Sequence, residues 1–117
     1  EIGIAYVHLV EADWDNAPQI PDDFRVTLRK TFTRSILAAG NYDLNKATRL
    51  VGAGLIDVAA FGRPFLTNPD LPTRLHDGLP LADLTGAVLY GGGATGYLGF
   101  GRYGEAGAED TGTDRAV

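Results

Sequence analysis

The sequence predicts an α/β fold with a parallel sheet. Short apolar runs recur between residues 2 and 61, and a segment with helical features follows each run. Turn residues such as glycine, asparagine and aspartate separate the runs from the helical segments. Strands that alternate with helices in this way form βαβ units, which place successive strands side by side in parallel.

The three predicted strands span residues 2–10, 35–39 and 56–61. The first is almost continuously apolar and too short for a helix, which is typical of a strand that is covered on both faces. Residues 11–21 contain aspartate, asparagine and two prolines, so we expect a loop at the carboxyl end of this strand.

Helices are predicted after each strand. The first begins at Asp22 or Asp23, with Phe24, Leu28 and Phe32 spaced along one face. In the second, Asp43 is the natural N-cap and glycines end the helix; its apolar face is Leu44, Ala47, Leu50 and Val51.

Proline and glycine mark the helices after the third strand. Pro64 suits the first turn of one helix, and Asp70 is expected to cap another that stops at Gly78.

Composition excludes several classes of function. The chain has 117 residues and is 44% hydrophobic, which suffices for one small unit but for only about half of a (βα)8 barrel. A net charge of −5 provides no basic stripe, so we expect no nucleic-acid partner. Without cysteine there are no disulfides or thiolate sites, and a cytoplasmic location is the expectation.

Two further expectations follow from what the sequence lacks. No apolar run approaches the roughly 20 residues that span a bilayer, so we expect no membrane partner. The sequence has no methionine, so Glu1 is not expected to be a retained translational start, and we expect a processed or excised part of a longer polypeptide.

The turns after the second and third strands suit a phosphate group. Gly40 and Asn41 follow the second strand, and Gly62 and Arg63 follow the third. Glycine lets backbone amides approach a dianion, and a guanidinium matches phosphate oxygens. Adjacent loops of this kind form the phosphate cradle of (βα)8 barrels. On residue chemistry alone, phosphate binding and an ordinary turn role are equally supported.

Other patterns are weaker candidates for a site. Residues 91–96 match the glycine spacing of dinucleotide-binding proteins, but no clear strand precedes them and no helix follows, which favours a flexible loop. His8 and His76 are far apart without a ligand partner, so no metal site is predicted. The aspartates match no calcium loop and are interpreted as caps or solvated groups; they are Asp13, Asp15, Asp22 and Asp23.

Three motifs then resemble a known family. The segments 38–43 (AAGNYD), 54–75 (GLIDVAAFGRPFLTNPDLPTRL) and 89–97 (LYGGGATGY) occur in the order and spacing of the old yellow enzyme family, close to its N-ethylmaleimide and alkene reductase branch. Residues 6–11 resemble the sixth strand of that family. The resemblance implies that residues 1–100 are the C-terminal three βα units of an FMN-binding (βα)8 barrel. Residues 101–117 are then expected to be a flexible tail.

The resemblance also implies roles for individual residues. Two backbone amides would bind the FMN phosphate, a glycine–arginine pair would complete the pocket, and a phenylalanine would pack near the isoalloxazine; these are Gly40, Asn41, Gly62, Arg63 and Phe61. Tyr90 would line the substrate side, although a buried aromatic with a backbone partner explains it equally well on chemistry alone. The family's catalytic groups lie in earlier strands, so no catalytic residue is expected in this chain.

The implied activity is that of an FMN-dependent NAD(P)H oxidoreductase that reduces activated alkenes such as enones, maleimides and nitroalkenes. This chain would supply the phosphate part of the site and would need the N-terminal part of the barrel, on the same or a companion chain. Two alternatives stay open. One is a different FMN or sugar-phosphate barrel enzyme, and the other is a non-catalytic fragment that dimerises to cover its sheet edges.

Overall fold

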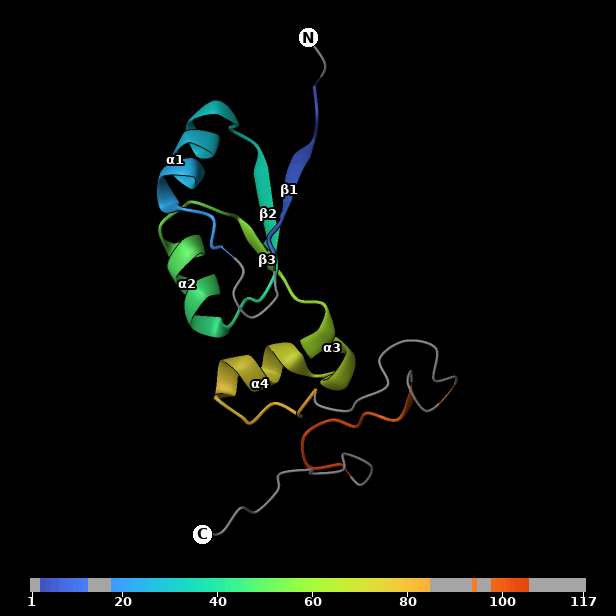
Figure 1. Cartoon of the computed structure of the whole chain (residues 1–117). Coiled ribbons are helices and arrows are strands. Elements are labelled where there is room, and N and C mark those ends of the chain that lie inside the picture. Colours follow the sequence, from blue (N-terminus) through green and yellow to red (C-terminus); the bar gives the residue numbers. More distant parts are fainter. Residues whose placement is uncertain (1–2, 13–17, 85–93, 95–97, 106–117) are drawn as a thin grey trace. The chain divides into compact units, whose positions relative to one another are not determined.

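A computed structural model describes residues 3–12, 18–84, 94 and 98–105. The chain divides into two compact units, Glu1–Phe61 and Gly62–Val117. Among the described residues, the first unit contains a three-stranded sheet and helices α1 and α2, and the second contains the short helices α3 and α4 (Figure 1).

The sheet of the first unit is parallel throughout. Its strands are β1 (Tyr6–Val10), β2 (Ser35–Ala39) and β3 (Val58–Ala60), in the order β1-β2-β3. This confirms the predicted parallel α/β fold. The third strand is shorter than predicted, because the Ile36 amide donates to the Asp57 carboxylate at 2.7 Å rather than to a strand carbonyl.

One face of the sheet carries the core. Helices α1 (Asp22–Thr31) and α2 (Leu44–Gly52) lie on the same side of the strands (Figure 1). The buried cluster beneath them consists of Ile36, Ala38, Tyr42, Ala47, Leu50 and Ile56. Successive connections on one side of the sheet are the arrangement expected for consecutive βα units.

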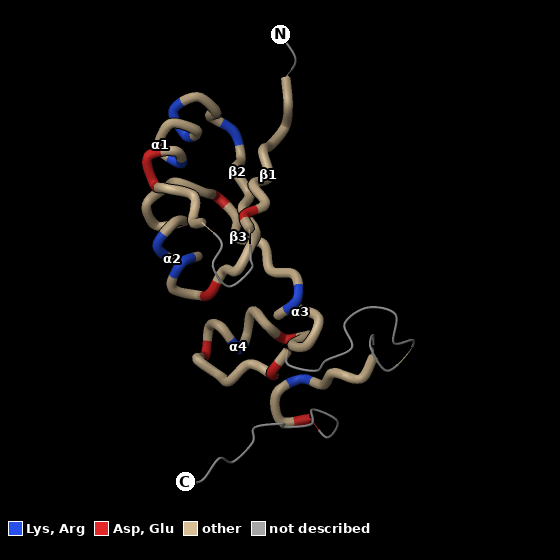
Figure 2. Tube along the Cα trace, viewed as in Figure 1, with Lys and Arg blue, Asp and Glu red and all other residues tan. Residues whose placement is uncertain are grey.

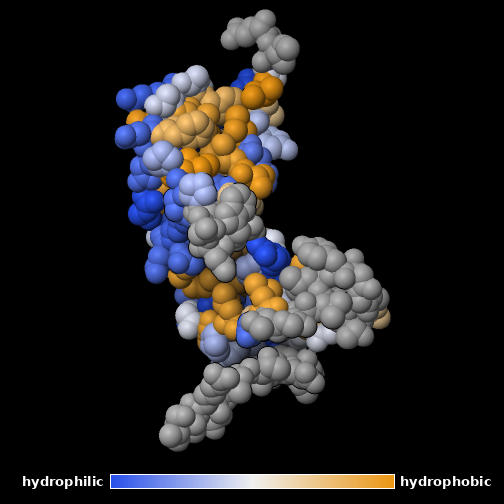
Figure 3. Space-filling view, viewed as in Figure 1, coloured by the Kyte–Doolittle hydropathy of each residue, from blue (hydrophilic) through white to orange (hydrophobic). Residues whose placement is uncertain are grey.

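The opposite face of the sheet is open in the described chain. Side chains on alternate strand positions point to it, and Tyr6, Val10 and Val58 are 57%, 79% and 47% exposed. Apolar residues are correspondingly visible at the surface around the strands in Figure 3. Within the first unit, the first strand is therefore covered on one face only, and coverage of its other face stays a prediction.

The buried face of α1 also differs from the prediction. Arg25 is 1% exposed, whereas Phe24 is 48% exposed. Arg25, Leu28 and Phe32 follow the spacing i, i+3, i+7, so they share one helix face, and Leu28 and Phe32 pack against the core. Phe24 lies beside that face. On α2 the outer members of the predicted stripe are likewise exposed, namely Leu44 and Val51.

Arg29 joins the amino ends of the strands. Its guanidinium donates to the carbonyls of Gly54 at 2.9 Å and Arg34 at 3.1 Å, and to the Asp57 carboxylate at 2.7 Å. The hydrogen bond from Arg29, followed by that from the Ile36 amide, lowers the pKa of Asp57. Such contacts connect α1 to the segments that enter β2 and β3 and serve the stability of this end of the sheet. Charged residues of the first unit gather mainly on its helices (Figure 2).

The second unit contains α3 (Arg63–Thr67) and α4 (Leu71–Asp77). Both begin with a proline in the first turn, and α4 ends at Gly78 with a left-handed φ of 68°, as predicted. Asp70 does not cap α4 with its side chain. Its carboxylate instead accepts from Arg74 at 2.7 Å and from the Tyr103 amide at 3.0 Å.

Arg74 also binds the segment after residue 98. Arg74, only 4% exposed, donates to the Gly101 carbonyl at 3.1 Å. Residues 106–117 lie outside the described part, and the domain boundary at residue 100 stays a prediction. None of the helices in the described ranges is long and apolar enough to cross a membrane.

Candidate functional site

The turns predicted to bind phosphate follow paired positions of the sheet. Ala39 and Ala60 are register partners at the carboxyl ends of β2 and β3. Gly40 and Asn41 continue from the first of these, and Phe61, which packs against the core cluster, continues from the second. In parallel α/β folds this edge of the sheet is where ligand-binding loops begin.

The remaining predicted site residues belong to the second unit or lie outside the described residues. Gly62 and Arg63 belong to the second unit, in which Gly62 is the N-cap of α3 and Arg63 its first residue. Tyr90 lies outside the described residues, as does the glycine-rich stretch 91–93.

Gly40 is required by its conformation and by close packing. Its φ is +116°, and a Cβ built there would lie 2.3 Å from the Glu11 carbonyl oxygen. Asn41 has a φ of +46°, an uncommon value for a residue with a side chain. Two successive left-handed residues turn the backbone sharply at the end of β2, and Asn41 is exposed. The turn is therefore accessible to a ligand.

The N-cap of α2 lies shortly after this turn in the sequence. Asp43 accepts a hydrogen bond from the Lys46 amide at 2.7 Å, which confirms the predicted N-cap. This carboxylate satisfies one of the amides of the first turn of α2.

Gly62 differs from Gly40 in its surroundings. Its φ is −97°, and a Cβ there would meet no described heavy atom within 4 Å. The space that a side chain would fill is therefore open among the described residues, and Arg63 beside it is exposed. Phosphate binding by Gly62 and Arg63 stays a prediction.

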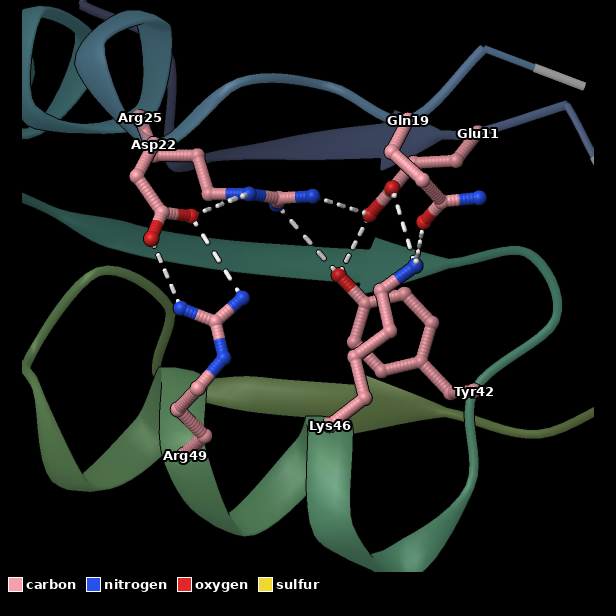
Figure 4. Close-up of polar contacts among 7 residues, drawn as sticks. All are labelled: Glu11, Gln19, Asp22, Arg25, Tyr42, Lys46 and Arg49. Atoms are coloured by element: carbon pink, nitrogen blue, oxygen red, sulfur yellow. Dashed lines mark hydrogen bonds and ion pairs between the residues drawn. The ribbon is translucent and has the colours of Figure 1, made fainter.

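A buried polar cluster lies beside the Gly40–Asn41 turn and was not predicted. Arg25 donates to Glu11 Oε1 at 2.8 Å, and both side chains are 2% exposed. The Tyr42 hydroxyl donates to the same oxygen and accepts from Arg25 Nη1 at 3.4 Å (Figure 4). Three segments far apart in sequence therefore meet at one carboxylate.

Lys46 completes the partners of Glu11. Its ammonium donates to Glu11 Oε2 at 3.2 Å and to Gln19 Oε1 at 2.9 Å, and it lies 4.4 Å from the centroid of the Tyr42 ring. The Glu11 carboxylate thus has two cations and one hydroxyl around it (Figure 4).

A second, exposed ion pair borders this cluster. Asp22 pairs with Arg49 at 2.7 Å, and both side chains are more than half exposed. Asp22 Oδ1 also lies 3.9 Å from Arg25 Nε, a buried atom with no hydrogen-bond partner in the described part of the chain. Asp22 therefore links the buried cluster to the surface of α1 and α2.

Three signals in the sequence could have revealed the cluster. Glu11 follows an apolar strand directly, Tyr42 follows the turn, and Arg25 falls on the same helix face as Leu28 and Phe32. A charge on an apolar helix face indicates a buried partner, because an unpaired buried charge is very costly.

The cluster shifts the pKa values of its members. Burial alone would raise the pKa of Glu11, but hydrogen bonds from Arg25, Tyr42 and Lys46 outweigh burial and hold that pKa below its ordinary value of 4.5. Burial and the neighbouring Glu11 carboxylate raise the pKa of Tyr42 to about 12. Glu11 is therefore ionised and Tyr42 protonated at neutral pH.

These shifts predict a pH dependence of stability. Glu11 contributes stability above pH 4.5, which is the ordinary pKa of glutamate in the unfolded chain. This stability is lost as the pH falls through the lower pKa that Glu11 has in the folded state. The contribution of Tyr42 is present below pH 10.0 and is lost as the pH rises through about 12. Urea unfolding across pH should show both declines, and Tyr42→Phe should reduce the alkaline one. An unchanged alkaline decline in that variant would contradict the assignment.

A sequence profile of the NADH:flavin oxidoreductase / NADH oxidase family matches residues 2–82. The chain belongs to this family. The resemblance to old yellow enzymes noted from the motifs is thereby confirmed, and the match includes the turns at residues 40–41 and 62–63 of this flavin oxidoreductase chain.

Individual proteins that are similar to this chain agree with the family match. The structure of morphinone reductase superposes with a TM-score of 0.76 at 36% identity, over 98% of this chain and 29% of that one. The old yellow enzyme of Trypanosoma cruzi gives a TM-score of 0.70 at 30% identity, over 84% of this chain and 26% of that one. 12-Oxophytodienoate reductase 1 of Oryza sativa subsp. japonica is 38% identical over 91 residues, 75% of this chain and 24% of its own length. The flavin oxidoreductase chain thus spans about a quarter of the length of the curated relatives it matches.

Proposed function

We propose that this chain supplies the FMN-phosphate part of the site in an NAD(P)H-dependent enzyme that reduces activated alkenes, such as enones, maleimides and nitroalkenes. The observation that carries the proposal is the accessible, sharply bent turn at Gly40–Asn41, at the carboxyl end of β2, in a chain of the flavin oxidoreductase family. FMN supplies the hydride chemistry when bound, and the protein binds and orients it.

Each predicted residue has a role in this proposal. The amides of Gly40 and Asn41 bind phosphate oxygens, and Gly62 leaves room for Arg63 to bind others. A side chain at either glycine position would interfere with phosphate binding. At Gly40 it would distort the turn, and at Gly62 it would occupy the open space beside the glycine. Phe61 packs near the flavin ring. Tyr90 lines the substrate side, and its replacement by phenylalanine alters substrate preference more than flavin reduction.

The remaining barrel is the proposed partner. The open face of the sheet bears Tyr6, Val10 and Val58, and both outer strands have an unpaired edge among the described residues. We propose that this chain forms the C-terminal three βα units of a (βα)8 barrel, whose N-terminal part covers that face and supplies the catalytic groups. A monodisperse, stable monomer of the 117 residues alone, by light scattering, would argue against it.

The function is tested on the complete polypeptide that contains this chain. We expect it to purify with flavin absorbance, to release FMN on denaturation, and to oxidise NADPH or NADH faster when an enone, maleimide or nitroalkene is added. Flavin binding without alkene reduction would favour another FMN enzyme. Absence of flavin binding after reconstitution with FMN would contradict the proposal.

Arg63→Ala should weaken FMN binding. Loss of a charged contact to phosphate costs about 1.5–3 kcal/mol, which corresponds to a roughly ten- to hundredfold lower affinity. Titration of the apoprotein with FMN, followed by fluorescence quenching, measures the effect. Lys30→Ala, which removes an exposed charge from α1, is the matched control and should leave the affinity unchanged. Equal affinities of Arg63→Ala and the unsubstituted protein would remove Arg63 from the site.

A further inference from the structure

We propose that Glu11 is a positioning residue for the Gly40–Asn41 turn, which it holds at both ends in the conformation that binds a phosphate group. The inference rests on the proposed function and adds to it a buried group that does not itself touch the ligand. Glu11 has a 2% exposed side chain, so it acts through its neighbours.

The backbone of Glu11 holds the beginning of the turn. Its amide donates to the Ala39 carbonyl at 2.8 Å, which extends the β1–β2 pairing to the last residue before the turn. Its carbonyl carbon and oxygen lie so close to Gly40 that a Cβ there would be 2.9 Å and 2.3 Å from them. Gly40 therefore packs directly against the Glu11 peptide group.

The side chain of Glu11 holds the end of the turn. Tyr42, the residue after Asn41, donates its hydroxyl to Glu11 Oε1, and Lys46 in the first turn of α2 donates to Oε2 at 3.2 Å. Arg25 holds the carboxylate from the other side at 2.8 Å. One residue thus contacts the chain immediately before and immediately after the turn.

The turn needs such support because its conformation is unfavourable by itself. Asn41 has a φ of +46°, a left-handed conformation that is unfavourable for most residues with a Cβ and that asparagine adopts more readily than they do. Such a conformation persists when the surrounding structure determines it. Without the hydroxyl of Tyr42 bound to Glu11, the turn would gain other conformations, and fewer of them would present amides to a phosphate.

The charge on Glu11 also points to positioning rather than to packing alone. An apolar group of similar volume often stabilises a fold as well as a buried ion pair does, so a buried carboxylate with three donors is weak support for a purely stabilising role. The cluster lies at the carboxyl ends of the strands, where the candidate turn begins, whereas the Arg29–Asp57 pair lies at the amino ends.

The test compares FMN with riboflavin, which has the same ring and no phosphate. In the complete polypeptide we expect Tyr42→Phe and Glu11→Gln to lower FMN affinity by roughly five- to twentyfold and to leave riboflavin affinity within about twofold. Tyr42→Phe keeps the buried ring and therefore tests the proposal even if Glu11→Gln does not fold. Arg29→Ala breaks an ion pair at the other end of the strands and should not change the ratio of the two affinities.

The outcomes separate this inference from the proposed function. If the unsubstituted protein binds riboflavin as tightly as FMN, the phosphate site itself is wrong and the inference falls with it. If the unsubstituted protein prefers FMN and both variants keep that preference, only the inference is overturned. Equal losses of both ligands in Tyr42→Phe would also overturn it, because they would indicate a general loss of structure.

Discussion

Gly40→Ala is expected to destabilise the protein by about 2–5 kcal/mol and to remove most FMN binding, since it combines a strained φ with an overpacked contact. The new Cβ would lie 2.3 Å from the Glu11 carbonyl oxygen, a distance that only movement of one backbone segment can relieve. The φ of +116° is also one that alanine rarely adopts. Urea unfolding and FMN titration measure the two effects.

Two other glycines are the controls for this prediction. Gly52 ends α2 and would place a Cβ in open space among the described residues, so Gly52→Ala should be neutral or stabilising by up to about 1 kcal/mol. Gly62→Ala should leave stability nearly unchanged but weaken FMN binding, because its Cβ would enter the proposed phosphate space. A Gly40→Ala variant as stable as Gly52→Ala would show that the turn adapts without cost.

Arg25→Met is expected to cost about 3–5 kcal/mol, because it leaves the buried Glu11 carboxylate without its nearest cation. Methionine keeps much of the apolar stem of the side chain, so the loss reports the missing charge rather than a cavity. The pKa of Glu11 should rise in this variant, and the acid decline of stability should move to higher pH.

A double variant and an exposed pair make this prediction specific. Adding Glu11→Gln to Arg25→Met should recover part of the lost stability, because no uncompensated buried charge remains. Arg49→Met removes the exposed partner of Asp22 and should cost no more than about 1 kcal/mol. Equal losses in Arg25→Met and Arg49→Met would show that burial of the first pair has no energetic consequence.

Local sequence patterns were enough to predict the parallel α/β fold, the Asp43 cap and the end of α4 at Gly78. These features depend on apolar periodicity and on residues three or four positions apart, which can be recognised within a short window. The same local patterns located the Gly40–Asn41 and Gly62–Arg63 turns. Family motifs then connected those turns with a flavin.

The burial of Arg25 rather than Phe24, and the need for glycine at position 40, are evident only from the folded structure. It also decided that Glu11 binds Tyr42 and Lys46, which are 31 and 35 residues away in sequence. These features share one cause. A buried charge is tolerated only where distant segments bring partners to it, and the requirement for glycine comes from the peptide group of Glu11, which follows β1.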